Sequence, residues 1–293
     1  MAPEIFHAHM DARSDLFCSD DPDLIFPWWS FSKTVLATAA LRLVGKGKLE
    51  LDQRLPDRQF TLRQLLQHQA GAPNYSKLAA YTRAVEERAD PWDVEDMLDQ
   101  CHAAQPEYMP GSGWAYSNTG YLIVRCLIER AANDDLGSAL QFLVFDPLEI
   151  DSVFLAKTRQ DMARAVWGNE NGYHPGWVYH GLLLGTAGDA VRFLNGLMTR
   201  DILSATLHEQ MISPHHIGGP VSGRPWQKTA YGLGLMCGEM NSVGRSIGHS
   251  GGGPENVCAV YHFPDVQEPV TVAAFCSGSD EGVAENEVVE LVV

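Results

Sequence analysis

Ser30 and Lys33 are the first residues along the chain whose types and spacing could do chemistry. They lie in the run Trp-Trp-Ser-Phe-Ser-Lys, where a segment with helical periodicity begins. Residues three apart share one face of a helix, so the lysine amine can reach the serine hydroxyl. A lysine activates a serine only when burial or nearby cations lower the pKa of its amine. The pair indicates nucleophilic catalysis but needs further support, because chance supplies about one Ser-x-x-Lys in a chain of this length.

A second candidate motif is Tyr116-Ser117-Asn118, in a turn-rich segment that leads into an expected helix. A phenolate held near a lysine ammonium can accept and return protons, and an amide can anchor a substrate carbonyl. The same residues also fit a loop tyrosine followed by an asparagine that caps the helix. The motif by itself leaves both interpretations open.

The third candidate is the glycine-rich run from Gly248 to Gly253, which contains His249 and Ser250. Glycines let a backbone approach a ligand closely, so that its N–H groups can point at a developing oxyanion. A plain glycine turn between strands is the alternative. The run also satisfies Gly-x-Ser-x-Gly, the nucleophile elbow of α/β-hydrolases, which would make Ser250 the nucleophile. Against the elbow, the residues that follow predict a strand instead of a helix, and His262 is the only later histidine.

The elements that must position these residues follow from periodicity and turn signals. Apolar residues at helical spacing predict a helix over 35–44 that Gly45 ends, and further helices over 121–132, 187–198 and 284–293. Thr61 and Gln64 fit a capping box. Residues 4–18 are compatible with a strand or a hairpin, and short strand-like segments lie at 231–236, 257–263 and 270–275. We therefore expect an α/β (α+β) protein with a sheet domain from 1–55 and 180–293 and a mainly helical domain from 56–179.

In this order, the three motifs resemble the serine β-lactamase and penicillin-binding protein superfamily. The Tyr-x-Asn version is similar to its class C branch, which also contains esterases, D-aminopeptidases and DD-peptidases. Two more stretches are similar to that branch, Leu-Leu-Gln-His-Gln-Ala-Gly-Ala-Pro at 65–73 and Gly-Leu-Leu-Leu-Gly-Thr-Ala-Gly-Asp at 181–189. The resemblance covers about residues 28–275. It implies a β-lactamase/transpeptidase-like fold, in which helices flank an antiparallel sheet and the active site lies in the cleft between the two domains.

The resemblance also implies roles for the reacting groups. Ser30 would be the acylated nucleophile, and Lys33 and Tyr116 would share the proton transfers. The backbone N–H groups of Ser30 and Gly252 would form the oxyanion hole, a type of site that typically lowers a barrier by about 3–4 kcal/mol. A water activated near Tyr116 would release the acyl group.

For substrate binding, the resemblance implies Asn118, His249, Ser250 and Gly251. Asn118 would bind the amide or ester side of the substrate, and the Ser250 hydroxyl would face the substrate. His249 would stand where the family often has a lysine. A histidine is largely neutral near pH 7, so it would hold a substrate carboxylate less firmly, although Ser250 could still donate to one. Family members usually have glycine and an aromatic residue at positions 255–256, where this chain has Glu and Asn.

Composition excludes several classes of partner. The 293 residues carry a formal net charge of -16, which argues against nucleic acid and anionic membranes. The six cysteines show no Cys-x-x-Cys pair or zinc-like spacing, and neither His7/His9 nor His215/His216 has a suitable third ligand, so we expect no metal and no cofactor. The N-terminus lacks a signal-peptide pattern and no apolar run approaches a membrane span, which predicts a cytoplasmic protein.

Together these features predict a serine hydrolase that acts through an acyl-enzyme on a small ester or amide. β-Lactamase and D-aminopeptidase or DD-peptidase activities in the same fold are alternatives, which the missing leader disfavours because β-lactamases and cell-wall peptidases act outside the cytoplasm. A non-catalytic, penicillin-binding-like sensor is the alternative of another class. The substrate is expected to be a small molecule, and the sequence predicts no particular oligomeric state.

Overall fold

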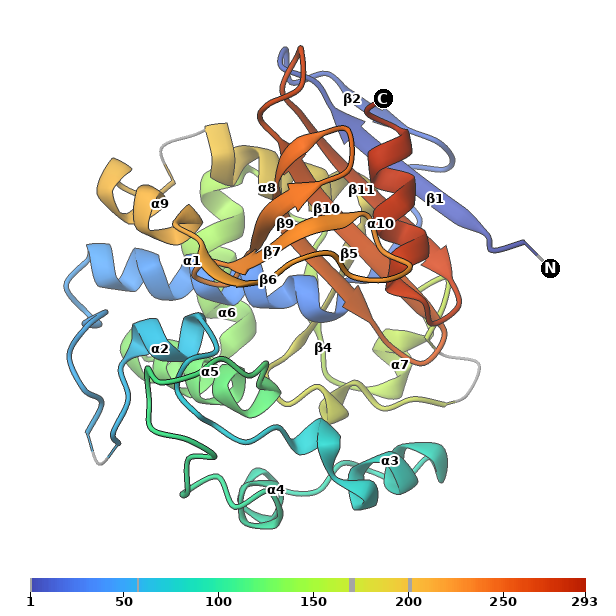
Figure 1. Cartoon of the computed structure of the whole chain (residues 1–293). Helices are drawn as coiled ribbons and strands as arrows, with labels where there is room; N and C mark the ends of the chain where they lie inside the picture. The colour runs from blue at the N-terminus through green and yellow to red at the C-terminus, as the bar shows by residue number, and fades with distance from the viewer. Residues whose placement is uncertain (1, 57, 169–171, 200–201) are drawn as a thin grey trace.

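The computed structural model describes residues 2–56, 58–168, 172–199 and 202–293. Its centre is an antiparallel sheet of eight strands in the order β2-β1-β11-β10-β9-β8-β7-β6 (Figure 1). The strands are β1 (Ile5–Met10), β2 (Leu16–Cys18), β6 (His215–Gly218), β7 (Trp226–Tyr231), β8 (Met236–Met240), β9 (Gly244–Gly252), β10 (Asn256–Phe263) and β11 (Val270–Ser277). Because β1 pairs with β11, the two ends of the chain share this sheet. The expected antiparallel sheet built from both chain ends is confirmed.

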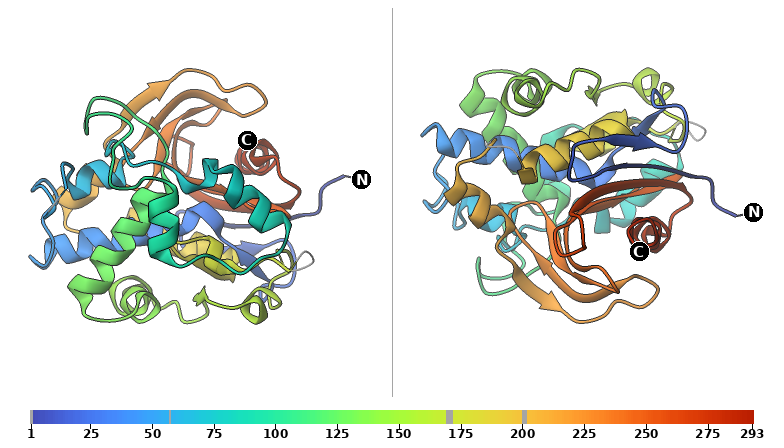
Figure 2. Two further views of the ribbon diagram at one scale, coloured as in Figure 1. Left: turned by 90° about the horizontal axis from the view of Figure 1, so that it is seen from below. Right: turned by 90° about the horizontal axis from the view of Figure 1, so that it is seen from above.

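Helices cover both faces of the sheet (Figure 2). Helix α8 (Ala187–Thr199) packs on β1 and β11, and the C-terminal helix α10 (Glu281–Glu290) packs on β10 and β11 from the opposite side. Strand β10 is buried along its whole length and β11 along most of it. A strand that is covered on both faces has apolar residues at successive positions, because both faces are buried. This explains why β10 and β11 are mostly apolar along their length.

A second, smaller sheet has the order β3-β5-β4 and consists of β3 (Ile25–Pro27), β5 (Leu182–Thr186) and β4 (Phe154–Ala156). Helix α1 (Ser32–Gly45) follows β3 after the one-turn helix η1 (Trp29–Phe31) and packs on α5 (Asn118–Ala132). Eleven of the fourteen residues of α1 are buried, so it is a core helix, and its position fixes whatever projects from its first turn.

The remaining elements are short and lie mostly between residues 56 and 179, at the bottom of Figure 1. The α-helices are α2 (Leu62–Leu66), α3 (Ala79–Glu86), α4 (Val94–Gln100), α6 (Leu136–Leu140), α7 (Arg159–Met162) and α9 (Ala205–Ile212). Single turns of other helix types are η2 (Tyr75–Lys77), η3 (Gln141–Phe145), η4 (Asp146–Leu148) and η5 (Pro175–Trp177). The division into domains at residues 55/56 and 179/180 stays a prediction.

Most expected elements appear within a few residues of their predicted bounds. Thr61 and Gln64 form the capping box of α2. The cap of α5 is Ser117, whose hydroxyl accepts the Gly120 N–H, so the alternative in which Asn118 caps this helix is wrong. The strand expected over 231–236 is also wrong: β7 ends and β8 begins there, and Gly234, with a φ of +78°, helps the chain to turn between them.

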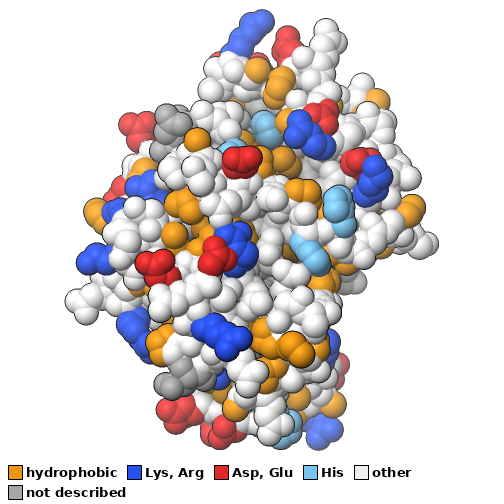
Figure 3. All heavy atoms as spheres, turned by 60° about the vertical axis from the view of Figure 1, so that its left-hand side comes forward, with side chains coloured by type: hydrophobic (Ala, Val, Ile, Leu, Met, Phe, Trp, Pro, Cys, Tyr) orange, Lys and Arg blue, Asp and Glu red, His pale blue; other side chains and the backbone are white. Residues whose placement is uncertain are grey.

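None of the described helices is long and apolar enough to cross a bilayer. On the face in Figure 3, acidic and basic side chains are interspersed.

Candidate active site

Ser30 lies in η1, where β3 gives way to the core helix α1. The preceding residue, Trp29, has a φ of +40°, which is strained for a bulky side chain. The Trp29 indole N–H holds this turn by donating to the Asn256 side-chain oxygen, at 2.9 Å. Ser30 lines a cavity of about 320 Å³. The turn therefore presents the serine to a space that can hold a small molecule.

Lys33 is completely buried, and its Nζ lies 3.2 Å from the Ser30 Oγ. Nζ also lies 5.0 Å from the centre of the Tyr116 ring and 5.7 Å from that of Tyr121. Burial holds the pKa of the Lys33 amine well below its ordinary value, and the charge of Glu281 opposes this shift only in part. A desolvated amine is uncharged at a lower pH than an exposed one, so Lys33 can take the proton of Ser30.

Tyr116 packs beside this pair. Its hydroxyl is buried and has no hydrogen-bond partner within the described part of the chain. Burial raises the pKa of the Tyr116 phenol, and the nearby Ser30 hydroxyl opposes that rise. The phenol is therefore protonated near neutrality and can pass on a proton, whereas the phenolate considered for Tyr-x-Asn is disfavoured in this state.

Asn118 begins α5 and also lines the cavity. Its amide nitrogen lies 3.4 Å from the Ser76 Oγ. The neighbouring Ser117 N–H donates to the Nδ1 of His68, at 3.1 Å, and Ser117 caps the helix. These contacts hold Asn118 at the cavity wall, where its amide can meet a substrate.

Residues 248–252 of the glycine-rich run form the second half of β9 and not a turn, and Gly253 follows the strand. The pairing of β9 with β8 stops at Gly248, so within the described part of the chain one edge of 249–252 has no neighbouring strand. The Gly253 N–H donates to the Asn256 backbone carbonyl at the start of β10. In an antiparallel pair, successive N–H groups of one strand point alternately towards the partner strand and away from it. The Gly252 N–H therefore points away from β10, to the open edge of β9. Ser30 and Gly252 both line the cavity, as an oxyanion hole made by their N–H groups requires.

Gly251 allows β9 to approach Ser30. A Cβ at this position would lie 2.6 Å from the Ser30 backbone nitrogen and 3.1 Å from the Trp28 carbonyl oxygen. Neither backbone atom can yield without moving η1. A glycine is therefore required where β9 meets Ser30.

Replacing Gly251 by alanine is expected to lower kcat/KM by about 100-fold, because displacing a reacting group by about 1 Å costs that much. The measurement is ester hydrolysis by the purified variant. Gly219→Ala is the matched control, since a Cβ there meets no atom within 4 Å. Equal activities of the two variants would contradict a tight contact between β9 and Ser30.

His249 is fully buried on the face of β9 that looks towards Ser30. Its Nδ1 contacts the Ser250 carbonyl oxygen, so Nδ1 carries the proton and Nε2 accepts from the Tyr231 hydroxyl, at 2.8 Å. Burial, together with the charge of Lys33, lowers the pKa of the His249 imidazole to about 3. His249 is therefore neutral and provides no positive charge for a substrate carboxylate.

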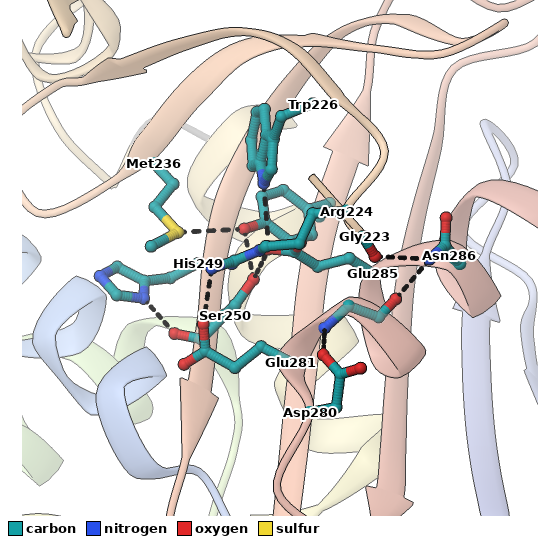
Figure 4. A network of polar contacts seen from close by, with 12 residues as sticks. Gly223, Arg224, Trp226, Met236, His249, Ser250, Asp280, Glu281, Glu285 and Asn286 are labelled. Atoms are coloured by element: carbon teal, nitrogen blue, oxygen red, sulfur yellow. Dashed lines mark hydrogen bonds and ion pairs between the residues drawn. The ribbon is translucent and has the colours of Figure 1, made fainter. Parts of the chain in front are cut away.

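Ser250 lies on the opposite face of β9 from His249 (Figure 4). Its hydroxyl is 2.7 Å from the Tyr261 hydroxyl and donates to Glu285 of α10. We expected this hydroxyl to face the substrate, but successive side chains of a strand alternate, and the one that follows His249 must point to the α10 face. The same position, inside a strand that leads into β10, does not suit Ser250 as an elbow nucleophile.

Glu285 is the centre of the network drawn in Figure 4. Its carboxylate is fully buried and receives the Arg224 guanidinium, with Nε 2.6 Å away, and the Trp226 indole N–H, at 3.1 Å. Arg224 also contacts Glu281, at 3.0 Å. The network joins α10 to β7, β9 and β10. Within it, the Arg224 guanidinium is paired with Glu285 and Glu281.

Replacing Glu285 by alanine is expected to lower the free energy of unfolding by about 3–5 kcal/mol, because Trp226 and Ser250 lose their acceptor and Arg224 keeps only Glu281 as an ionic partner. Urea denaturation measures the change. Glu290→Ala is the control, because Glu290 is exposed on the same helix and should change stability by less than about 0.5 kcal/mol. Similar losses for both variants would show that the buried pair is not important for stability.

Several cavity residues escaped the sequence interpretation. Aromatic side chains of Trp29, Tyr75, Tyr81 and Tyr173 line the cavity together with His180. The His180 Nε2 lies 3.1 Å from the Lys33 Nζ. These residues come from segments far apart in the chain, and no local pattern distinguishes them. In the described residues, no group of three or more His, Cys, Asp or Glu side chains is arranged to hold a metal ion.

The chain is similar in sequence to a penicillin-binding protein and to an esterase. The chain is 25% identical over 264 residues to penicillin-binding protein 4* of Bacillus subtilis, covering 78% of this chain and 56% of that protein. It is 31% identical over 146 residues to esterase EstB of Burkholderia gladioli, covering 43% of this chain and 37% of that protein. The chain thus spans about half or less of the length of these relatives.

Among solved structures, D-amino acid amidase from Ochrobactrum anthropi aligns with a TM-score of 0.81 at 22% identity, over 98% of this chain and 95% of that one. A penicillin-binding protein from Bacillus halodurans aligns with a TM-score of 0.80 at 18% identity, over 98% and 95%. These likenesses confirm the expected β-lactamase/transpeptidase-like fold. The sequence profile of the beta-lactamase family matches residues 19–292, nearly the whole chain. The chain therefore belongs to the beta-lactamase family.

Proposed function

We propose that the protein is a serine hydrolase that cleaves a small, uncharged ester or amide through an acyl-enzyme on Ser30. The observation that carries this proposal is the contact between the Ser30 hydroxyl and the buried Lys33 amine, 3.2 Å apart, at a cavity that Gly252 also lines. Relatives that are named as an esterase and an amidase support the same class of reaction.

The proposed reaction begins when Lys33 takes the proton of Ser30 and Oγ attacks the substrate carbonyl carbon. The N–H groups of Ser30 and Gly252 stabilise the negative oxygen of the tetrahedral intermediate. As the bond to the leaving group breaks, that group takes the proton, passed from Lys33 directly or through the protonated Tyr116. Water then attacks the acyl carbonyl carbon and gives a proton to the same pair. As the bond between the acyl carbon and Oγ breaks, the pair passes a proton to Oγ, which returns Ser30 to its free form.

The proposed substrate is uncharged because the described residues that line the cavity offer it no charged side chain as a partner. His249 is neutral, Ser250 donates to Glu285, and Arg224 is held by Glu285 and Glu281. The described residues around the cavity include no Lys, Arg, Asp or Glu, and four of them are aromatic. A cavity of about 320 Å³ with aromatic walls favours an apolar or aromatic acyl group.

A substrate panel tests this proposal. We expect p-nitrophenyl acetate and p-nitrophenyl phenylacetate to be hydrolysed, with kcat/KM at least about tenfold higher for the phenylacetate because one buried aromatic ring contributes more than about 1.4 kcal/mol. The carboxylate-bearing nitrocefin and a peptide ending in D-Ala-D-Ala should react at least about 100-fold more slowly than the phenylacetate. A preference for either carboxylate substrate would instead support β-lactamase or DD-peptidase activity.

Labelling distinguishes an enzyme from a sensor. A serine-directed phosphonate is expected to add its mass to Ser30, as seen by peptide mass spectrometry. Labelling together with ester turnover supports the hydrolase. Absence of both would favour the non-catalytic sensor, and labelling of Ser250 would support the elbow.

We also propose that the protein acts in the cytoplasm. All six cysteines are free, and four of them are buried, which fits a compartment that keeps thiols reduced.

A further inference from the structure

His180 is a buried histidine that the reaction described above does not use. It precedes β5, is 3% exposed and lines the cavity. Its Nε2 lies 3.1 Å from the Lys33 Nζ. Among the described residues, Lys33 Nζ forms its hydrogen bonds with the Ser30 hydroxyl and with this imidazole.

The chemistry of Lys33 requires a partner of this kind. A neutral amine has one lone pair and two N–H bonds, and it can take the proton of Ser30 only if the lone pair points at that hydroxyl. An acceptor on another side of Nζ turns an N–H away from Ser30 and so orients the lone pair. Once Lys33 is an ammonium, the same acceptor stabilises the new charge.

We propose that His180 is a positioning residue for Lys33: its neutral imidazole accepts an N–H through Nε2, directs the amine lone pair to Ser30 and holds the ammonium that forms. This inference rests on the proposed hydrolase reaction. It requires the tautomer in which Nδ1 carries the proton.

The surroundings keep His180 in its neutral form. Burial lowers the pKa of its imidazole well below the ordinary value, and the charges of Lys33 and of Arg125 from α5 act in the same direction. His68 and His249 face the same region, and burial lowers the pKa of each. Glu281 of α10 is the carboxylate that acts on Lys33, and Tyr116 and Tyr121 present ring faces to its Nζ. A neutral imidazole can accept a hydrogen bond, which an imidazolium cannot.

The opposite tautomer makes a different prediction. With the proton on Nε2, His180 would donate to the lone pair of Lys33 and compete with Ser30. Removing the ring would then speed up acylation. The His180 Nδ1 is buried and has no hydrogen-bond partner among the described residues. No contact of Nδ1 therefore fixes the tautomer, and the test measures it directly.

The experiment compares His180→Leu with His180→Gln in the full chain. Leucine keeps the site apolar without an acceptor, while the glutamine side-chain oxygen can accept from Lys33. We expect the leucine variant to acylate about 10- to 100-fold more slowly in single-turnover reactions with p-nitrophenyl phenylacetate, with little change in substrate dissociation constant. The glutamine variant should recover at least half of that loss on a logarithmic scale.

The pH profile adds a measurement that loss of structure alone would not change. Because His180 stabilises the ammonium, its removal lowers the pKa of Lys33. The acid limb of kcat/KM should therefore move to lower pH in the leucine variant and stay near its original position in the glutamine variant. His262→Leu is the control for losing a buried histidine, since His262 pairs with Thr271, at 2.9 Å.

Each outcome supports or overturns the inference. An unchanged acylation rate and acid limb in the leucine variant, while the parent enzyme still labels at Ser30, overturns the role of His180 alone. Faster acylation also overturns it, as does a nitrogen-15 NMR spectrum of the parent enzyme that shows the proton on Nε2. That spectrum decides the question even if the leucine variant fails to fold. A parent enzyme without labelling or turnover overturns the proposed function, and the role of His180 with it.

Discussion

Replacing Ser30 by alanine is expected to abolish covalent labelling and to lower ester hydrolysis by about 10,000-fold or more, which is the scale of losing a catalytic nucleophile. The alanine variant should fold normally, because the Ser30 side chain faces the cavity and its one described side-chain hydrogen bond is to Lys33. Intact-protein and peptide mass spectrometry after phosphonate treatment measure the label, and p-nitrophenyl phenylacetate measures the rate.

Ser250→Ala is the matched comparison, since it removes the other candidate serine. Its hydroxyl lies among Tyr261 and Glu285 on the far face of β9, so the main expected effect is a loss of stability, with labelling at Ser30 retained. A Ser250 variant that loses the label while the Ser30 variant keeps it would reverse the assignment of the nucleophile.

Replacing Lys33 by methionine is expected to lower kcat/KM by about 1,000-fold, because a positioned general base contributes about 100- to 10,000-fold. Methionine fills nearly the same volume without a proton acceptor, so the affinity for a non-reacting ester analogue should change little. In the parent enzyme, activity should rise with pH along an acid limb well below pH 10, because burial lowers the pKa of Lys33. The methionine variant should lack that limb.

Lys33 also makes stability depend on pH. The pKa of the Lys33 amine is lower in the folded protein than in the unfolded chain. At any pH between these two pKa values, the amine is protonated in the unfolded chain and largely uncharged in the folded protein. Folding is then opposed at lower pH, and stability rises as the pH increases towards the unfolded pKa of about 10.4. Lys33→Met should be more stable than the parent protein at neutral pH, and the difference should shrink at alkaline pH. Urea denaturation at several pH values measures this. A methionine variant that is less stable at neutral pH, or as active as the parent, would contradict a buried, uncharged base.

The sequence by itself determined the features that depend on local geometry. Ser30 and Lys33 are three residues apart at a helix start, and helical spacing alone brings their side chains to one face. The capping box of α2 and the apolar runs of β10 and β11 are equally local patterns. The order of the three motifs was enough to identify the family that the sequence profile confirms.

Only the tertiary structure decided which groups surround that pair. A strand alternates its faces, but the sequence does not say which face lies against Ser30, so the direction of Ser250 followed only from the packing of α10 on β9. His180 reaches Lys33 across 147 residues of chain, and Arg224 meets Glu285 across 61. Contacts between such distant segments arise from how helices and strands pack together, and no spacing within one segment encodes them. The contact between Ser30 and Lys33 is therefore readable from the sequence, while the groups that we propose to orient this pair and to limit its substrates come from the fold.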